Sequence, residues 1–434
     1  MKVSTGIRFT RRRLLHIGFL GGIGMSLADF LRISSATDGS QGPKPKADAV
    51  IFVHLAGGPA HLDTLDMKPD APAEERGPFG KIDTRLPGLT ACEHLPKLAG
   101  VMDRFTLLRG ISHAVGDHLA ANQFLMTGNR PNAALRFPAM GSVLTKERPS
   151  SDDIPSFVAV PNSDANPGFL GVEYAPFKTT TVPVAGKPFE MRGLALAEGM
   201  TVERFRRRDA LRADIDTALR DYEAAGEVLD GLDRFGQKAM EMILSPRARE
   251  AFDVSRESPS IAKLFQPDEL GQSCLLATRL VDSGVRFVTV THDGWDTHLN
   301  NFESLQTKLL PQLDAAAVAL VEALKQKGRL ERTLVVISGE FGRTPTSNAN
   351  QGRDHWPRTM WTLAAGGGVK SGQLIGGTDA NGHGPDDATN LKPDDLAASI
   401  YRSLGIDHRM EYHTKTGRPV ILVQNGEPIT EMFA

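Results

Sequence analysis

The chain has 434 residues, 24% of them charged and 40% hydrophobic, and its formal net charge is −2. This ordinary globular composition lacks the basic excess of a nucleic-acid-binding protein, so we expect no nucleic-acid partner. Aromatic residues make up only 6%, which argues against a stacking platform for carbohydrate or single-stranded nucleic acid. The two cysteines, Cys92 and Cys274, cannot form a disulfide framework or a thiolate metal site. A single bridge between them is the alternative to two buried free thiols, which we expect.

Residues 1–36 carry the pattern of an export signal. Three arginines, Arg11 to Arg13, precede a Gly-rich apolar stretch from Ile17 to Leu31, which predicts a twin-arginine signal followed by a linker over 37–47. A short amphipathic helix with a basic start is the alternative. The apolar stretch is too short and too interrupted to span a membrane. We therefore expect the twin-arginine machinery to export the folded chain to the periplasm or beyond, with no stable transmembrane span in the mature chain.

Strand-like and helix-like segments alternate through the mature domain, residues 48–434. The predicted strands are 48–55, 105–109, 156–160, 285–290, 332–338 and 359–365, with a short edge strand at 417–423. The predicted helices are 94–102, 119–126, 267–283, 302–327 and 394–404. This alternation implies right-handed crossovers and a mostly parallel sheet in an α/β fold. The charged amphipathic pattern over about 200–256 predicts a helical insert that acts as a lid or cap.

Acidic and imidazole side chains crowd the loop after the predicted strand 285–290. Within seven positions this loop carries His292, Asp293, Asp296 and His298. In an open α/β sheet, ligands bind at the carboxyl ends of the strands, so the pattern indicates a metal site. Hydrogen-bonded surface turns are the alternative interpretation.

Other predicted strands also end in polar loops. The strand 332–338 runs into Glu340 and Arg343, and Asp354 and His355 follow shortly afterwards. Two clusters at corresponding strand ends favour a metal or anion site over surface turns. The first strand is followed by His61 and Asp63, for which helix capping by Asp63 is the alternative, and the strand 105–109 is followed by His113, Asp117 and His118.

Several motifs together resemble a known family. They are the twin-arginine start, Asp117-His118 to Thr127-Gly128, residues 292–298, 339–345, 352–357 and 370–377. The chain resembles the bacterial exported proteins of domain-of-unknown-function family fifteen-hundred-and-one. That family is similar to a distant branch of the alkaline phosphatase and sulfatase superfamily, whose members use two divalent metals, or one calcium, on a doubly wound sheet. The resemblance therefore implies a doubly wound, mostly parallel α/β domain of alkaline phosphatase-like type with a helical insert.

The resemblance also implies metal ligands, with departures from the superfamily pattern. The Asp-x-x-x-His motif becomes Asp293 and His298, five apart, with Asp296 as a substitute. The Asp-His-Gly motif keeps only a carboxylate, Glu340, and a later metal-binding imidazole corresponds to His355.

Two other superfamily positions are changed. The position of the nucleophile holds His118, where no Ser, Thr or Cys stands. The Asp that normally ends the first strand is missing, and His61 and Asp63 are its nearest replacements.

These residues suggest a reaction class. An imidazole and carboxylate set suits Zn²⁺, Mn²⁺ or Fe²⁺ better than Ca²⁺. Hydrolysis would use metal-activated water or His118 as a covalent phosphoryl acceptor. Arg343 is predicted to hold the anion, and a salt bridge to Asp354 or another acid is its alternative role. Four residues are predicted to orient ligands from a second layer: His113, Asp117, His292 and Asp354.

The first functional hypothesis is an exported, metal-dependent hydrolase that acts on a small or polymeric phosphate or sulfate ester. The second is a catalytically silent relative that serves as a binding or assembly partner at the cell surface. The missing nucleophile and the missing first-strand Asp favour the silent relative, whereas the two dense ligand loops favour the hydrolase.

Overall fold

The computed structural model describes residues 43–151, 153–187, 189, 245–414 and 416–433. The expected export signal, most of the linker and the greater part of the expected helical insert lie outside these residues. Within the described part of the chain, no helix is both long and apolar enough to cross a membrane.

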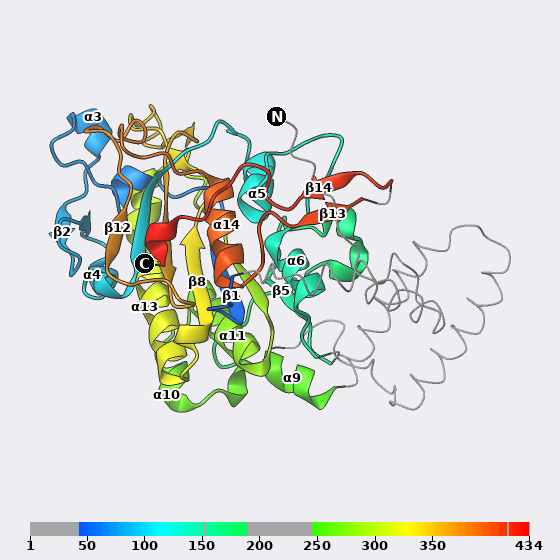
Figure 1. Cartoon of the computed structure of the whole chain (residues 1–434). Helices are drawn as coiled ribbons and strands as arrows, with labels where there is room; N and C mark the ends of the chain where they lie inside the picture. The colour runs from blue at the N-terminus through cyan, green and yellow to red at the C-terminus, as the bar shows by residue number, and fades with distance from the viewer. Residues whose placement is uncertain (1–42, 152, 188, 190–244, 415, 434) are drawn as a thin grey trace, which may run out of the picture. The chain divides into compact units, whose positions relative to one another are not determined.

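The described residues build one eight-stranded central sheet (Figure 1). Its strands are, in spatial order, β12 (Gln373–Ile375), β4 (Thr106–Ile111), β11 (Met360–Ala365), β8 (Thr333–Ser338), β1 (Ala49–Leu55), β7 (Phe287–His292), β5 (Phe157–Val160) and β6 (Phe177–Lys178). Only β11 runs antiparallel to its neighbours, and the other seven strands share one direction. The predicted α/β class with a mostly parallel sheet is therefore confirmed.

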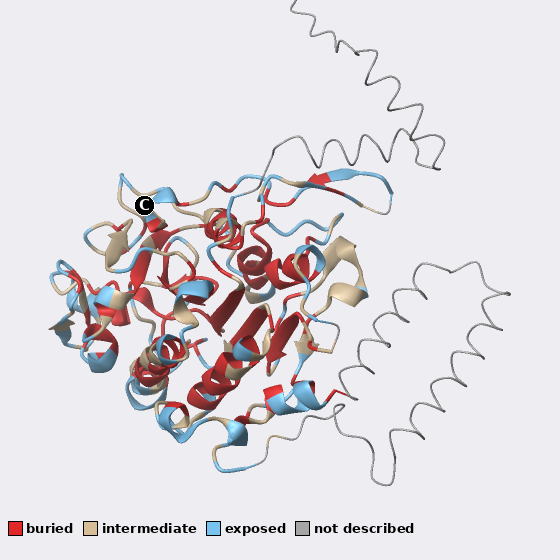
Figure 2. Cartoon of the chain, turned by 60° about the horizontal axis from the view of Figure 1, so that its bottom comes forward, coloured by how far each residue is buried: buried red, intermediate tan, exposed pale blue. Residues whose placement is uncertain are grey.

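Strands such as β1 carry apolar side chains on both sides, and helices cover both faces of the sheet. In β1, Ile51 and Val53 belong to one apolar cluster, whereas Val50 and Phe52 belong to the other. The first cluster includes side chains of α4 (Pro96–Ala99), α11 (Glu269–Ser283) and α13 (Leu310–Gln326). The second includes side chains of α5 (His118–Thr127), α6 (Met140–Glu147) and α14 (Pro393–Ser403). Figure 2 shows the buried strands at the centre with the exposed residues around them.

Shorter elements surround this core. They are α3 (Ala73–Arg76), β2 (Lys81–Asp83), β3 (Thr90–Cys92), α9 (Pro246–Phe252), α10 (Pro259–Ala262), α12 (Asn301–Ser304), β9 (Gly342–Arg343), β10 (His355–Trp356), β13 (Glu411–His413) and β14 (Pro419–Ile421). The end of the expected helical insert is α9, whose Ala248, Ala251 and Phe252 join the same apolar cluster as α11. This part of the insert packs on the core of the domain.

Most predicted elements occur where the sequence indicates them. Helix α11 begins after Asp268, whose side chain accepts a hydrogen bond from Gly271 N, and ends at Gly284 in the left-handed conformation. The predicted helix 302–327 is interrupted by a π-helical turn at Leu305–Leu309. Pro311 is the second residue of the helix that follows, and because it lacks a backbone N–H it cannot continue the regular hydrogen-bond ladder.

Two predicted elements differ in the structure. The helix predicted at 94–102 is shorter in the structure, where α4 begins at Pro96 and ends before Gly100; the Asp314 carboxylate caps its first turn by accepting from the N–H groups of Lys97 and Leu98. The edge strand predicted at 417–423 is β14, which pairs with β13 in a separate hairpin instead of joining the central sheet. The cysteines fit the expectation, since Cys92 and Cys274 are both buried and free.

Candidate metal centre

The loops after three adjacent strands meet at one edge of the sheet. Strands β1, β7 and β8 are parallel neighbours, so their carboxyl ends lie side by side. Gly57, just after β1, has a φ of 113°, and a Cβ atom on it would lie only 2.1 Å from Asp296 N. Glycine is required at this position both for the conformation and for the close approach. The polar loops predicted from sequence are therefore in direct contact.

The antiparallel strand β11 contributes its beginning to the same edge. The segment before it, β10, pairs with β9 so that His355 lies opposite Arg343. A second tight contact holds this segment beside the β7 loop, since a Cβ on Gly352 would lie 1.9 Å from His298 O. Helix α5 adds its first residue, His118. Side chains that are far apart in the sequence therefore lie together at the carboxyl edge of the sheet.

Three imidazole nitrogen atoms approach a single carboxylate oxygen. Asp296 Oδ1 lies 3.2 Å from His118 Nε2, 3.1 Å from His298 Nε2 and 3.3 Å from His355 Nε2. His298 Nε2 and His355 Nε2 are themselves 2.9 Å apart. The four side chains are between 26% and 46% exposed, so the cluster is open to solvent and to a substrate.

Each of these imidazoles has a fixed acceptor for its other nitrogen. His118 Nδ1 lies 2.6 Å from Glu340 Oε1, and His298 Nδ1 lies 2.7 Å from Asp354 Oδ1. His355 Nδ1 lies 2.8 Å from the carbonyl oxygen of Gly116. Because carboxylate and carbonyl oxygens only accept, each Nδ1 carries a proton, and Nε2 is the ring nitrogen that faces Asp296 Oδ1. Metal-binding histidines in proteins are oriented in this way.

This arrangement fits a divalent cation. Two facing lone pairs at 2.9 Å repel each other unless a proton or a cation lies between them, and His118 Nε2 is buried without a hydrogen-bond partner. Tetrahedral ligands at about 2.05 Å from Zn²⁺ are about 3.3 Å apart, close to the separations around Asp296 Oδ1. Ligand atoms of His118, Asp296 and His355 all lie within 4.8 Å of one another. His298 adjoins this trio.

The carboxylates at the cluster are ionised at neutral pH. Burial alone would raise the pKa of Glu340, but hydrogen bonds from His118 and His54 outweigh it and lower the pKa to about 2. Burial would likewise raise the pKa of Asp296, but the hydrogen bond and charge of Arg343 lower it to about 2. The hydrogen bond to Glu340 raises the pKa of His118 despite desolvation. The negative charge of the group favours a bound cation.

Glu340 stands behind His118, outside the group of converging nitrogen atoms. Its Oε1 accepts from His118 and from Gly57 N at 2.9 Å, and its Oε2 lies 3.2 Å from His54 Nε2. Both oxygens are therefore occupied by protein donors. Sequence reasoning missed His54, because it lies within an apolar strand and not in a polar loop. The alternation along β1 could have found it, since it is the polar residue on the side of Val50 and Phe52.

Arg343 is buried and committed to protein acceptors. Its Nη2 lies 2.5 Å from Asp296 Oδ1 and also donates to Gly57 O. Its Nε donates to Gly58 O at 3.1 Å, and its Nη1 donates to Arg353 O at 3.0 Å. This geometry fits the alternative role weighed for Arg343, an ion pair, with Asp296 as the acid in place of Asp354. Arg343 orients Asp296 and ties three loops together.

The expected orienting residues occupy different places. Asp354 holds His298, and the hydrogen bond from that imidazole lowers the pKa of Asp354. His113 Nδ1 accepts from Val115 N, so its Nε2–H donates to Glu340 O at 2.8 Å. Asp117 caps α5 by accepting from Ala120 N and thereby positions the helix that begins with His118.

His292 lies in the core, where Trp295 Nε1 donates to its Nδ1 and its Nε2 donates to Gln312 Oε1. It contacts Trp295, the neighbour of Asp296, and none of the converging ligand atoms.

Three predicted metal-binding residues lie apart from the cluster. Asp63 is fully buried, and its two oxygens receive Arg353 Nε and Nη2 at 2.7 and 2.8 Å. His61 is buried too and contacts Gly382 O through Nε2 at 2.8 Å. Asp293 is exposed, and no hydrogen bond or ion pair within the described residues involves its carboxylate. Asp63 is therefore half of a buried ion pair, and Asp296 occupies the place expected for Asp293.

An exposed arginine follows His355 closely in the sequence. Arg358 lies three residues after His355, and its guanidinium stands 5.8 Å from the centre of the Trp356 ring. Trp356 is held in turn by a 2.9 Å hydrogen bond from its Nε1 to His383 O. Among the described residues, no carboxylate pairs with Arg358. Sequence reasoning passed over this residue, although its nearness to His355 along the chain was a usable signal.

Together, fold and site define an α/β protein with a candidate His/Asp metal centre at the carboxyl edge of its sheet. The chain belongs to the family described as "Protein of unknown function (DUF1501)", whose model matches residues 47–433. The family predicted from the motifs is thereby confirmed. Comparison with curated proteins found no matching relative.

The similarity to solved structures is distant. The lipoteichoic acid synthase LtaP from Listeria monocytogenes has 11% identity and a TM-score of 0.37, over 89% of this chain and 77% of that one. Alkaline phosphatase from the Antarctic bacterium TAB5 has 11% identity and a TM-score of 0.37, over 83% and 98%. The PsFucS1 sulfatase from Pseudoalteromonas sp. has 12% identity and a TM-score of 0.33, over 87% and 70%.

Proposed function

We propose that this protein is an exported, metal-dependent hydrolase of a phosphate or sulfate ester. The observation that supports the proposal is the convergence of three oriented imidazoles on Asp296 Oδ1 at 3.1–3.3 Å. Ester hydrolysis is the reaction that the sequence resemblance implies. Zn²⁺, Mn²⁺ and Fe²⁺ match this nitrogen-rich donor set better than Ca²⁺ does.

The chain's own residues define the working parts of such a site. His118, Asp296 and His355 would hold the cation, and His298 stands beside them. When bound, a divalent cation lowers the pKa of a water molecule and polarises an ester oxygen. Glu340, Asp354 and Gly116 O keep the imidazoles in the tautomer that presents Nε2, so no reorganisation is needed on binding.

Arg358 is the cation we propose for holding the substrate anion, in place of Arg343. It is exposed and carries no carboxylate partner among the described residues, whereas Arg343 is buried and engaged with protein acceptors. A guanidinium that stacks on an indole keeps its N–H edges available for an oxyanion.

His118 remains the alternative nucleophile. Its Nδ1–H is held by Glu340, which leaves Nε2 as the reactive lone pair, as in the carboxylate–histidine pairs of nucleophilic sites. A covalent route predicts a phosphohistidine, which is stable in alkali and labile in acid. The same His118 nitrogen cannot hold a cation and attack at once, so detection of this adduct would favour the covalent route.

A binding or assembly partner at the cell surface is the second candidate function. The observation that favours it is the engagement of Arg343, because the arginine expected to hold an anion is already saturated by the protein. Under this hypothesis the cluster is a structural ion site or a hydrogen-bonded group. Export by the twin-arginine machinery is part of both proposals.

Metal analysis and hydrolase assays distinguish the two functions. The purified chain is loaded with Zn²⁺ or Mn²⁺, and hydrolysis of aryl phosphate and aryl sulfate esters is measured with Asp296→Asn and His355→Ala as loss-of-ligand variants. Asp293→Asn is the matched control, because it removes an exposed carboxylate three residues from Asp296. Bound metal with activity lost only in the ligand variants supports the hydrolase. Negligible bound metal and no turnover support the binding partner.

A further inference from the structure

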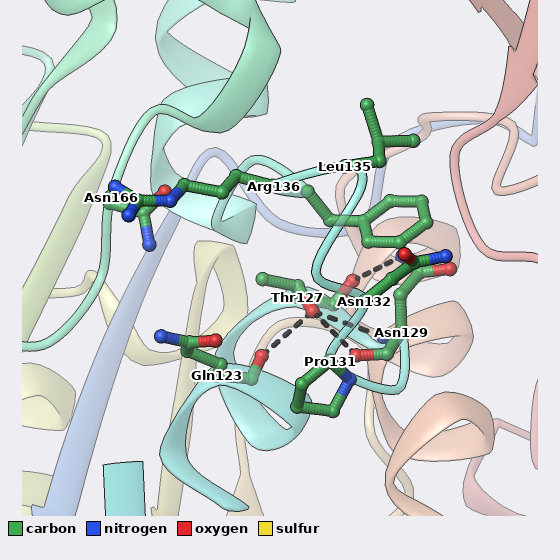
Figure 3. Close-up of a pocket in the computed structure, with 9 residues that line it drawn as sticks. Gln123, Thr127, Asn129, Pro131, Asn132, Leu135, Arg136 and Asn166 are labelled. Atoms are coloured by element: carbon green, nitrogen blue, oxygen red, sulfur yellow. Dashed lines mark hydrogen bonds between the residues drawn. The ribbon is translucent and has the colours of Figure 1, made fainter. Parts of the chain in front are cut away.

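A small polar cavity lies between α5 and the loop that follows it (Figure 3). Its volume is about 30 Å³, which is room for about two water molecules or for the oxygen end of one small anion. Six of its nine lining residues are polar: Gln123, Thr127, Asn129, Asn132, Arg136 and Asn166. None of the nine is acidic, and one is a cation.

Two of the asparagine side chains that line this cavity have their amide oxygen occupied and their NH₂ group available to donate. Asn132 Oδ1 accepts from Ala134 N at 2.8 Å, and Asn166 Oδ1 accepts from Gly168 N at 2.9 Å. Only the oxygen of an asparagine side chain can accept a hydrogen bond from a backbone N–H. The NH₂ group of each of these two side chains therefore remains free to donate to another partner. No hydrogen bond or ion pair within the described residues engages these two NH₂ groups or the Arg136 guanidinium.

The backbone that carries these donors is held in place. Phe169 N donates to Arg136 O at 3.0 Å, and Ala139 N donates to Asn166 O at 2.9 Å. Gly168 has a φ of 52°, and a Cβ there would lie 2.5 Å from Arg136 O, so the two segments are in close contact. These contacts fix the backbone of Arg136 and Asn166, while the side chains of Arg136 and Asn132 are exposed and accessible to a ligand.

We propose that this cavity is an anion-binding site that takes a sulfate, phosphate or carboxylate group. Arg136, Asn132 and Asn166 line a space without a carboxylate, and their guanidinium and amide NH₂ groups match the acceptor oxygens of such an anion. The site is distinct from the metal cluster and does not require a cation. The proposal therefore goes beyond the proposed function and can hold if that function fails.

The cavity lies within reach of the cluster along one helix. Gln123 and Thr127 follow His118 by five and nine residues in α5, which corresponds to about 7.5 and 13.5 Å along the helix axis. The anion that occupies the cavity has two chemically equivalent sources. One is a free inorganic ion, and the other is an anionic substituent on a polymer whose ester group lies at the metal centre.

Titration of the full chain with inorganic sulfate, at constant ionic strength in chloride, tests the site. We expect Asn166→Asp to weaken sulfate binding at least tenfold, because it keeps the acceptor for Gly168 N and replaces the NH₂ donor with a negative oxygen. Arg136→Gln is expected to do the same by removing the cation. Asn162→Asp and Arg418→Gln are matched controls at exposed positions outside the cavity and are expected to leave the affinity within twofold.

The metal cluster is the competing binding place for sulfate, and a further arm separates the two. The titration is repeated with chelator-treated protein and with Asp296→Asn, and sulfate binding is expected to persist in both. Loss of binding in those two samples, with full binding in Asn166→Asp and Arg136→Gln, would overturn the proposal. Unchanged melting temperatures without sulfate show that the variants are folded.

A sulfated oligosaccharide in place of inorganic sulfate identifies the source of the anion. A polymer source predicts tighter binding than inorganic sulfate, with the gain lost in Arg136→Gln. A free-ion source predicts equal affinity per sulfate group. If Arg136→Gln leaves the affinity for the oligosaccharide unchanged, the proposed anion site is contradicted for either source.

Discussion

Replacing Asp296 by Asn tests whether its carboxylate holds a cation. The substitution preserves the size of the side chain but removes the charge that faces three imidazole nitrogen atoms at 3.1–3.3 Å. It also removes the charged partner of the buried Arg343, which keeps its three backbone acceptors. We expect the metal-free variant to lose about 1.5–3 kcal/mol of unfolding free energy, the scale of a hydrogen bond to a charged group.

The effect on metal binding is larger and can be calculated. At a free metal concentration of 100 times Kd, binding stabilises the wild-type protein by about 2.7 kcal/mol. Unfolding entropy of about 2.1 cal/mol/K per residue, over the roughly 390 residues of the family match, gives about 0.8 kcal/mol/K. The wild-type melting temperature should therefore rise by about 3 °C. A hundredfold weaker Kd reduces the stabilisation to about 0.4 kcal/mol and the shift to about 0.5 °C.

Differential scanning fluorimetry with and without Zn²⁺ or Mn²⁺, supported by metal analysis, measures both shifts. Asp293→Asn is the control and should keep the wild-type response, because its carboxylate is exposed and makes no hydrogen bond or ion pair with the described residues. An Asp296→Asn protein with the full metal shift would refute the assignment of this carboxylate. If Asp293→Asn instead lost the metal-induced rise in melting temperature, Asp293 would be the ligand, as the comparison with the Asp-x-x-x-His motif implied.

Three further predictions concern single residues. Asp63→Ala leaves the guanidinium of Arg353 buried without its carboxylate, so chemical denaturation should show a loss of about 3–5 kcal/mol, and a loss below about 1 kcal/mol would contradict the structural role. Burial lowers the pKa of His292 to about 4 in the folded state, whereas the unfolded value is about 6.5. Between these values the unfolded chain binds the extra proton, so stabilisation of about 3 kcal/mol is present above pH 6.5 and is lost as the pH falls to 4. His292→Gln should flatten the curve of denaturation midpoint against pH in this window, and an unchanged slope would assign the effect to other groups. Arg358→Gln should raise KM for an anionic ester about fivefold with kcat within twofold, since an exposed ion pair contributes about 1 kcal/mol, and an unchanged KM excludes Arg358 from substrate binding.

Sequence patterns predicted the elements of the fold well because local forces decide them. The β-branched run that becomes β8 is buried at all six positions, and Gly284 ends α11 in a conformation that glycine adopts without strain. The helix predicted at 94–102 was too long, since α4 spans only Pro96–Ala99, and the N–H groups of its Lys97 and Leu98 are capped by Asp314, more than two hundred residues away. No local pattern could reveal that contact.

For the candidate site, the loops were predictable and the positions within them were not. The sequence motif favoured Asp293 with Asp296 as a substitute, but the approach of Gly57 to Asp296 N brings only the second carboxylate into the group. His355 precedes a strand, yet it reaches the carboxyl edge because β11 is the antiparallel member of the sheet. His54 escaped notice because it is a strand residue whose partner, Glu340, lies 286 positions away.

The sequence by itself determined where strands, helices and ligand-bearing loops lie, because apolar periodicity and glycine and proline chemistry act over a few residues. Only the tertiary structure decided which polar side chains face one another. That choice depends on strand order, on the direction of β11 and on two ion pairs, Arg343 with Asp296 and the buried pair Arg353 with Asp63, which joins residues 290 positions apart. Long-range pairing of this kind follows from the packing of the whole sheet and leaves no mark on any single stretch of sequence.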